Sequence, residues 1–100
     1  MSDRVYTQDE IFAAVRRLLK KYHAERAILF GSYARQEADS SSDIDLIVIG
    51  GIKFDPTDVF CIAEELHRTL GKPVDVCELR ELDANSAFYN TVMAEGVQIA

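Results

Sequence analysis

The chain contains few of the residues that mark special classes of protein. It has no tryptophan, two cysteines, two prolines and five glycines among 100 residues. The two cysteines form no CxxC pair, so we expect Cys61 and Cys77 to be small core residues in a reducing cytosol. No apolar run approaches the ~18 residues of a membrane span, and the polar N-terminus lacks a signal-peptide core. The sequence therefore predicts a cytoplasmic protein without a membrane anchor.

Basic residues are also scarce. Eleven Lys and Arg stand against 17 Asp and Glu, which gives a net charge of −6. This excess of acid excludes a generally basic surface, and we expect no direct binding to nucleic acid. Residues 36–100 hold thirteen of the acids and only four of the bases. A solvated acidic surface would explain most of them, so the question is which acids have a function.

The length and the apolar content fit one folded unit. A chain of 100 residues that is 48% hydrophobic and 28% charged is too apolar to be disordered. It is also too short for a catalytic domain plus a separate substrate domain. We expect residues 1–100 to form a single domain.

Apolar periodicity and helix signals predict alternating helices and strands. The expected elements are a helix from the Thr7–Glu10 capping box to about Tyr22, a strand at 27–30, a helix from about Ser32, a strand at 43–49, a helix from Asp55-Pro56 to Gly71, a strand at 73–79, a helix from about Asp83 to Ala94 and a short tail at 97–100. The order α-β-α-β-α-β-α predicts an α+β fold with helices packed on a small mixed sheet.

Three acidic positions in two predicted strands are difficult to explain by packing. Asp43 and Asp45 begin an otherwise apolar strand, and because strand side chains alternate, both lie on one face with Cα atoms roughly 6.6 Å apart. Asp75 stands between two valines in the next strand. If the two strands are neighbours, three carboxylates meet, and such hard oxygen ligands suit Mg²⁺ or Mn²⁺. The alternative is that all three are solvating charges at strand ends or edges.

The Gly31-Ser32 turn is a third candidate feature. Glycine at a strand-to-helix turn allows a ligand to approach the backbone, and a helix N-terminus presents free N–H groups to phosphate oxygens. An ordinary turn with Ser32 as the helix cap would look the same. No Lys-Ser or Lys-Thr pair follows the glycine, so the turn is not a Walker loop.

Taken together, these residues resemble a known family. Gly31-Ser32-Tyr33-Ala34-Arg35, a seven-residue spacer, Asp43-Ile44-Asp45-Leu46 and the isolated Asp75 are similar to the signature of the DNA polymerase β superfamily. The chain most resembles the minimal nucleotidyltransferases, or MNT proteins, along nearly its whole length. Gln36 departs from the pattern, because the family usually has glycine there.

The resemblance implies a mechanism and a fold, the nucleotidyltransferase fold. Asp43, Asp45 and Asp75 would bind two Mg²⁺ ions, or Mn²⁺, and would be the catalytic residues. Gly31 and Ser32 would hold the β- and γ-phosphates of ATP, with Arg35 as a further phosphate contact or a simple surface residue. A hydroxyl oxygen would attack the α-phosphorus and Asp75 would accept its proton, so that AMP is transferred and pyrophosphate leaves.

The resemblance also implies a partner. MNT proteins pair with helical HEPN-domain proteins, which often act as RNase toxins, and some transfer AMP to the partner's tyrosine. An alternative is a non-catalytic antitoxin-like subunit that masks its partner, and a homo-oligomer is also compatible with the sequence. Because so short a chain leaves no domain for selecting the acceptor, we expect another protein to supply it.

Overall fold

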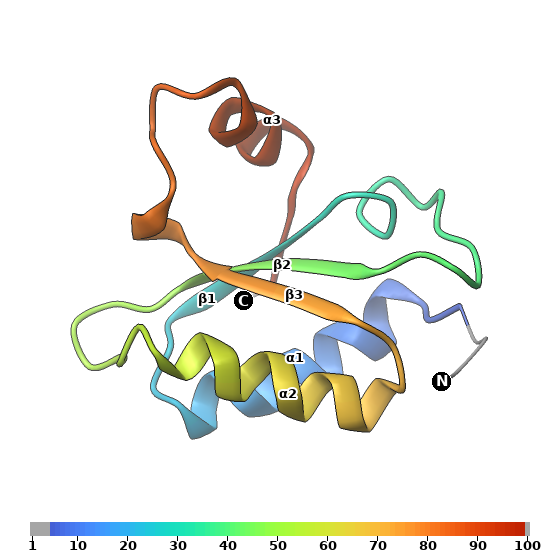
Figure 1. The fold of residues 1–100 in the computed structure, drawn as a ribbon, viewed down its shortest axis with the longest axis horizontal. Helices are drawn as coiled ribbons and strands as arrows, with labels where there is room; N and C mark the ends of the chain where they lie inside the picture. The colour runs from blue at the N-terminus through green and yellow to red at the C-terminus, as the bar shows by residue number, and fades with distance from the viewer. Residues whose placement is uncertain (1–4, 100) are drawn as a thin grey trace.

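The computed structural model describes residues 5–99, which fold into two helical layers around a four-stranded sheet (Figure 1). The elements in chain order are α1 (Gln8–Lys21), β1 (Arg26–Phe30), β2 (Ile44–Ile49), α2 (Asp58–Leu70), β3 (Val74–Glu78), the 3₁₀-helix η1 (Leu79–Glu81), α3 (Ala87–Glu95) and β4 (Val97–Ile99). The sheet order is β3-β2-β1-β4. Strands β2 and β3 run parallel, and β1 is antiparallel to both β2 and β4. The predicted α+β fold with a mixed sheet is confirmed.

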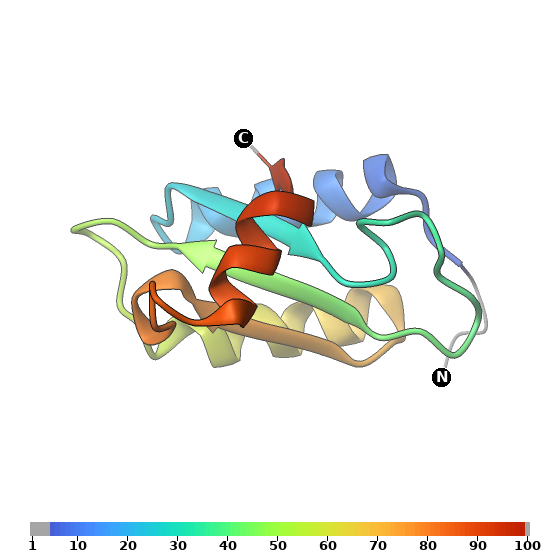
Figure 2. The same cartoon turned by 90° about the horizontal axis from the view of Figure 1, so that it is seen from above.

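Helices cover the two faces of the sheet unequally. Helices α1 and α2 pack side by side on one face, and α3 alone crosses the other (Figures 1 and 2). Ile44, Leu46 and Val48 belong to the large core beneath α1 and α2, whereas Ile47 belongs to a small core beneath α3. Because side chains alternate along a strand, Asp45 lies on the same face as Ile47. The half-buried Asp45 is thus on the sparsely covered face.

The predicted helix signals mostly hold. Thr7 and Glu10 form the capping box of α1, and Gly71 ends α2 in the left-handed conformation at φ 69°. The predicted start of α2 is two residues early. Asp55 instead caps the preceding turn, where its Oδ1 accepts hydrogen bonds from the Thr57 N–H at 3.0 Å and the Thr57 hydroxyl at 2.8 Å.

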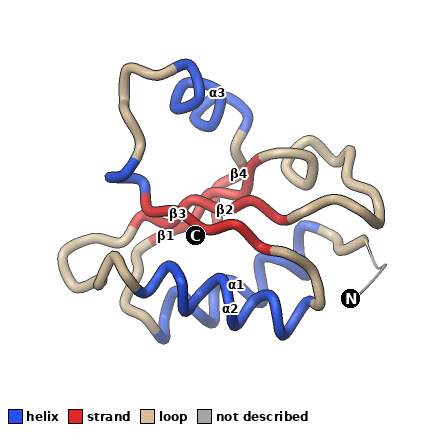
Figure 3. The backbone as a smooth tube through the Cα atoms, in the orientation of Figure 1, coloured by secondary structure: helices blue, strands red, loops and turns tan. Residues whose placement is uncertain are grey.

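Two predicted elements are wrong, and both lie beside β1 (Figure 3). The helix expected from Ser32 is a run of turns over residues 31–36, in which Gly31 and Gln36 adopt left-handed backbone angles that a helix cannot contain. The expected tail contains β4, which pairs Val97 with Leu29 and buries Ile99. Helix α3 also starts later than predicted, at Ala87, where the Ser86 side chain caps it.

Several side chains differ from their expected burial. Cys61 is exposed on α2 rather than in the core, while Cys77 is half-buried against the small core beneath α3. The helical spacing of Phe88 and Met93 predicts core positions, or a partner surface if they are exposed, and on α3 they are 48% and 43% exposed. Within residues 5–99, the helices are too short or too polar to cross a membrane.

Candidate active site

The carboxylates of Asp45 and Asp75 lie opposite each other on neighbouring strands. The parallel register of β2 and β3 pairs Asp45 directly with Asp75, so both side chains are on the face that α3 partly covers. Asp45 also pairs with Phe30 at the end of β1. The site therefore forms where β2 and β3 begin and β1 ends, at the right of the sheet in Figure 1. The sequence prediction depended on this adjacency, and the strands are indeed neighbours.

Asp43 adds a third negative charge from the segment immediately before β2. It is exposed, as is Asp75, whereas Asp45 is half-buried. Burial raises the pKa of the Asp45 carboxyl, and the charges of Asp75 and then Asp43 raise it further. Both effects disfavour the ionised form of Asp45, because its carboxylate loses contact with water and lies near two like charges. The three predicted carboxylates are thus electrostatically coupled around Asp45.

Gly31 brings the turn after β1 into contact with Asp45. Its φ is 74°, and a Cβ built on it would stand 2.7 Å from Asp45 Oδ2. A side chain at this position would therefore clash with the carboxylate and strain the backbone. The glycine is required both for the turn and for the close approach of the turn to Asp45.

The turn leaves hydrogen-bond donors available although it is not a helix. The Gly31 carbonyl accepts from the N–H groups of Ala34 and Arg35, at 3.1 and 3.2 Å, which folds the chain back. Across the described residues, the N–H groups of Ser32 and Tyr33 donate to no protein acceptor. Free N–H groups beside a glycine form a suitable cradle for anionic oxygens.

Arg35 and Tyr33 have contacts other than the three carboxylates. Arg35 is exposed and forms ion pairs with Glu37 at 3.1 Å and with Glu95 of α3 at 3.8 Å. Tyr33 is 3% exposed and belongs to the large core. A pocket of about 470 Å³ beside Tyr33 is lined by residues of the α1 entry and by Gln36 and Ala38, and none of the three carboxylates lines it.

The chemistry of the three carboxylates fits a hard divalent cation. Oxygen ligands alone favour Mg²⁺ or Mn²⁺ over zinc. Across residues 5–99, no three His, Cys, Asp or Glu side chains already converge closely enough to enclose a metal ion. Because like charges repel, convergence of Asp43 and Asp75 on Asp45 requires a cation to offset their charge.

Sequence reasoning missed one buried charge near these carboxylates. Lys72 is 2% exposed and its Nζ donates to the Ser40 carbonyl at 2.8 Å. Its place between Gly71 and Pro73 gives no periodic signal of burial. The only sequence signal for the burial of Lys72 was its position in the short connection between a helix and a strand.

Known proteins resemble the chain across this site. The family of polymerase beta nucleotidyltransferases matches residues 14–100. A protein of Methanocaldococcus jannaschii named as a protein adenylyltransferase is 41% identical over 68 residues, which are 68% of this chain and 73% of that protein. A structure of a minimal nucleotidyltransferase is 30% identical with a TM-score of 0.74 and 89% of each chain covered. A crystal structure of a toxin–antitoxin with AMP-PNP contains a chain 25% identical, with a TM-score of 0.76 and coverage of 89% of this chain and 72% of that one.

Proposed function

Because the chain belongs to the polymerase beta nucleotidyltransferase family, we propose that it transfers AMP from ATP to a hydroxyl group and releases pyrophosphate. The observation that carries this proposal is the pairing of Asp45 with Asp75 beside the Gly31 turn. The whole of residues 1–100 would act as a single nucleotidyltransferase domain.

Asp43, Asp45 and Asp75 would hold two Mg²⁺ ions, for which Mn²⁺ can substitute. Bound there, the ions would supply positive charge for the entering and leaving oxygens. Asp75 accepts the proton of the acceptor hydroxyl. The acceptor oxygen then bonds to the α-phosphorus, the bond from that phosphorus to the bridging oxygen breaks, and pyrophosphate leaves with the electron pair.

The Gly31-Ser32 turn would hold the β- and γ-phosphates. The unpaired N–H groups of Ser32 and Tyr33 support this role, because each can donate to a phosphate oxygen. Arg35 is already paired with two glutamates. Those ion pairs would compete with a phosphate contact, so we assign Arg35 a secondary role.

The acceptor would be a hydroxyl on a helical HEPN-type protein with which the chain acts as an antitoxin. The likeness to a chain of a toxin–antitoxin crystallised with AMP-PNP supports a role in a toxin–antitoxin pair. The same likeness favours a second candidate, in which the chain neutralises its partner by masking it, without chemistry. A homo-oligomer is compatible with either function.

Asp43→Asn tests the catalytic proposal directly. The chain, purified with whatever partner accompanies it in its native host, is incubated with Mg²⁺ and ATP labelled at the α-phosphate. We expect Asp43→Asn to lower label transfer by at least ~100-fold, because a metal ligand is lost. Asp83→Asn is the matched control, since Asp83 is exposed and an asparagine keeps the acceptor for the Asn85 N–H. Undiminished transfer by Asp43→Asn would refute the assignment.

A further inference from the structure

Lys72 is a buried cation that the proposed chemistry does not use. Only 2% of its surface is exposed, and placing an ammonium group away from water is unfavourable without a compensating partner. Its Nζ donates a hydrogen bond of 2.8 Å to the carbonyl of Ser40, which belongs to a loop 32 residues earlier in the chain. The lysine therefore ties the start of β3 to the loop that precedes β2.

That loop, residues 38–42, is organised around Asp39. Asp39 Oδ1 accepts from the Ser41 N–H at 2.9 Å and from the Ser41 hydroxyl at 2.7 Å. The Asp39 N–H in turn donates to the Ser42 hydroxyl at 2.9 Å. The bonds from Ser41 lower the pKa of the Asp39 carboxyl, and those from Ser42 and the charge of Lys72 add to this. The ammonium group thus interacts with the loop through one hydrogen bond and through charge.

The segment that carries Asp43 is fastened on both of its sides. On one side, Lys72 binds the Ser40 carbonyl. On the other, the Ile44 N–H donates to the Pro73 carbonyl at 3.1 Å. Lys72 and Pro73 are consecutive, and Asp75 follows two residues later. One short stretch of chain therefore sets the position of Asp43 relative to Asp75.

We propose that Lys72 is a positioning residue that holds Asp43 in place for the divalent cation. This inference rests on the proposed function, because it assumes that Asp43 and Asp75 share a metal site. Lys72 acts through the loop and touches neither substrate nor cation. Without the Lys72 ammonium group, the loop at residues 38–42 keeps its internal hydrogen bonds but loses the bond from Lys72. Bringing Asp43 and Asp75 together around the cation then costs additional free energy, which weakens cation binding.

The test measures binding of Mn²⁺ alone, by the loss of its free electron paramagnetic resonance signal. Lys72→Met keeps the length of the aliphatic stem and removes the donor. We expect its Kd for Mn²⁺ to rise by ~10-fold, the lower end of the effect of removing a group that orients metal ligands. Label transfer should fall at limiting Mn²⁺ and recover at saturating Mn²⁺, so that kcat changes less than the apparent metal affinity. A purely structural lysine would lower stability in EDTA without moving this metal dependence.

Three variants make the outcome decisive. Lys72→Arg, which keeps a charged donor, should restore most of the affinity, and Lys53→Met, at an exposed turn, should bind Mn²⁺ like the unmodified chain. Should Lys72→Met fail to fold, Lys72→Gln takes its place, and the same rise in Kd is expected because its side chain is too short. Unchanged Mn²⁺ affinity in the folded variant overturns the inference.

The proposed function can fail separately. If the unmodified chain binds no Mn²⁺, or if Asp43→Asn binds it equally well, the metal site itself is refuted and the role of Lys72 falls with it. If Asp43→Asn loses Mn²⁺ and Lys72→Met does not, only the role of Lys72 is refuted.

Discussion

At the scale of single residues, two left-handed positions shape the turn between β1 and β2. Gly31 has φ 74° and Gln36 has φ 58°. Glycine is required at the first because a Cβ would meet Asp45. At the second, Gln36 adopts a left-handed conformation that costs ~1–2 kcal/mol for residues other than glycine. Glutamine at this position thus leaves the turn folded and costs stability.

Replacing Gln36 with glycine should therefore stabilise the chain. Glycine relieves the backbone strain in the folded state, which stabilises the chain. Glycine also gives the unfolded chain more conformational freedom, which destabilises the folded state by ~0.4–1 kcal/mol, and we expect the first effect to be larger. We expect a net gain of about 0.5 kcal/mol, or about 2–4 °C in Tm, measured by calorimetry in EDTA. Lys53→Gly, at an exposed turn without a positive φ, should lower the Tm instead. A lower Tm for Gln36→Gly would show that this strain does not limit stability.

The carboxylates of the candidate site were predictable residue by residue, but Lys72 was not. Spacing within a strand places Asp43 and Asp45 on one face, and an acid between two valines is conspicuous. Burial of Lys72 depends on a loop that packs over it from 32 residues away. Local periodicity contains no information about such a contact.

At the scale of elements, the long periodic segments were predictable and the short ones were not. Helices α1 and α2 each show an apolar stripe over three or more turns, with recognisable signals at the ends. Strand β4 has three residues, and its strand character comes from pairing with β1. The turn after Gly31 fails as a helix because its left-handed residues prevent propagation. Tertiary pairing thus makes β4 a strand, and left-handed backbone angles prevent a helix after Gly31; neither is visible in local periodicity.

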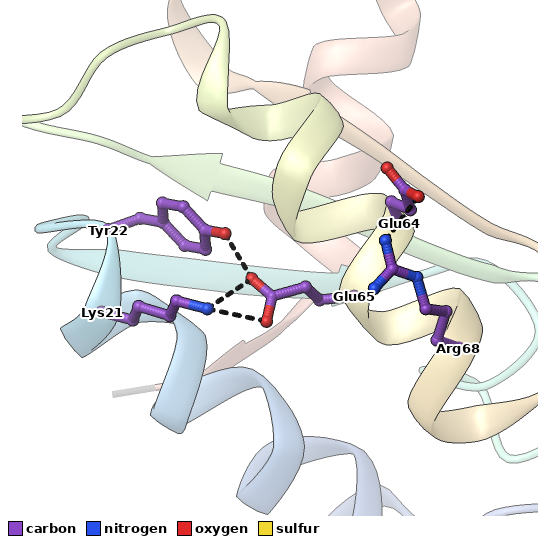
Figure 4. Close-up of polar contacts among 5 residues, drawn as sticks. All are labelled: Lys21, Tyr22, Glu64, Glu65 and Arg68. Carbon is purple, nitrogen blue, oxygen red and sulfur yellow. Dashed lines mark hydrogen bonds and ion pairs between the residues drawn. The ribbon is translucent and has the colours of Figure 1, made fainter.

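A polar contact ties α1 to α2 on the surface away from the site (Figure 4). Glu65 of α2 accepts hydrogen bonds from Lys21 Nζ at 2.9 and 3.1 Å and from the hydroxyl of Tyr22. The Tyr22 bond and then the Lys21 bonds lower the pKa of the Glu65 carboxyl from its ordinary 4.5. Neighbouring Glu64 pairs with Arg68 within α2 at 2.6 Å. The two glutamates therefore offer a matched comparison between an interhelical and an intrahelical contact.

Glu65→Gln should lower stability at neutral pH more than Glu64→Gln does. A carboxyl whose pKa is depressed by folding stabilises the folded state above its unfolded pKa, and this stabilisation is lost as pH falls through the folded value. The Tm difference between the unmodified chain and Glu65→Gln should thus be constant above about pH 5 and shrink toward zero below the depressed pKa. Thermal melts from pH 7 to pH 3 in matched salt provide the measurement. A Tm difference independent of pH would mean that the ionised Glu65 carboxylate contributes nothing to the stability of the folded state.

At the scale of the whole molecule, the coupled carboxylates and the exposed apolar residues of α2 and of the loop before it occupy different places. The coupled carboxylates lie at one end of the sheet, where β2 and β3 start. Exposed apolar side chains lie on the β2–α2 loop and α2 at Ile52 and Phe60, and on α3 at Phe88 and Met93. Phe88 stacks edge-on against Phe30, the residue of β1 that pairs with Asp45. Two divalent ions would reduce the net charge of −6 to about −2. If the proposed partner binds the exposed apolar residues of α2 and of the loop before it, the proposed transfer and partner binding are separable by mutation.

Replacing Asp43, Asp45 and Asp75 together with asparagine should remove transfer while leaving partner binding intact. The three substitutions remove the burial of a charged carboxylate and the repulsion, which together raise the pKa of Asp45, so the variant should fold at least as well as the unmodified chain in EDTA. A control with Asp58→Asn, Glu64→Gln and Asp83→Asn makes the same change in net charge on α2 and on the loop before α3, outside β2 and β3.

Each variant is co-expressed in the native host with the partner that purifies with the chain. We expect both variants to retain the partner, and only the control to transfer label from α-labelled ATP and to prevent growth arrest by the partner. Neutralisation requires chemistry under the proposed function, so it should disappear with the carboxylates. If the triple asparagine variant still protects the cells, masking alone explains the antitoxin effect, and transfer of AMP is a separate property of the same fold.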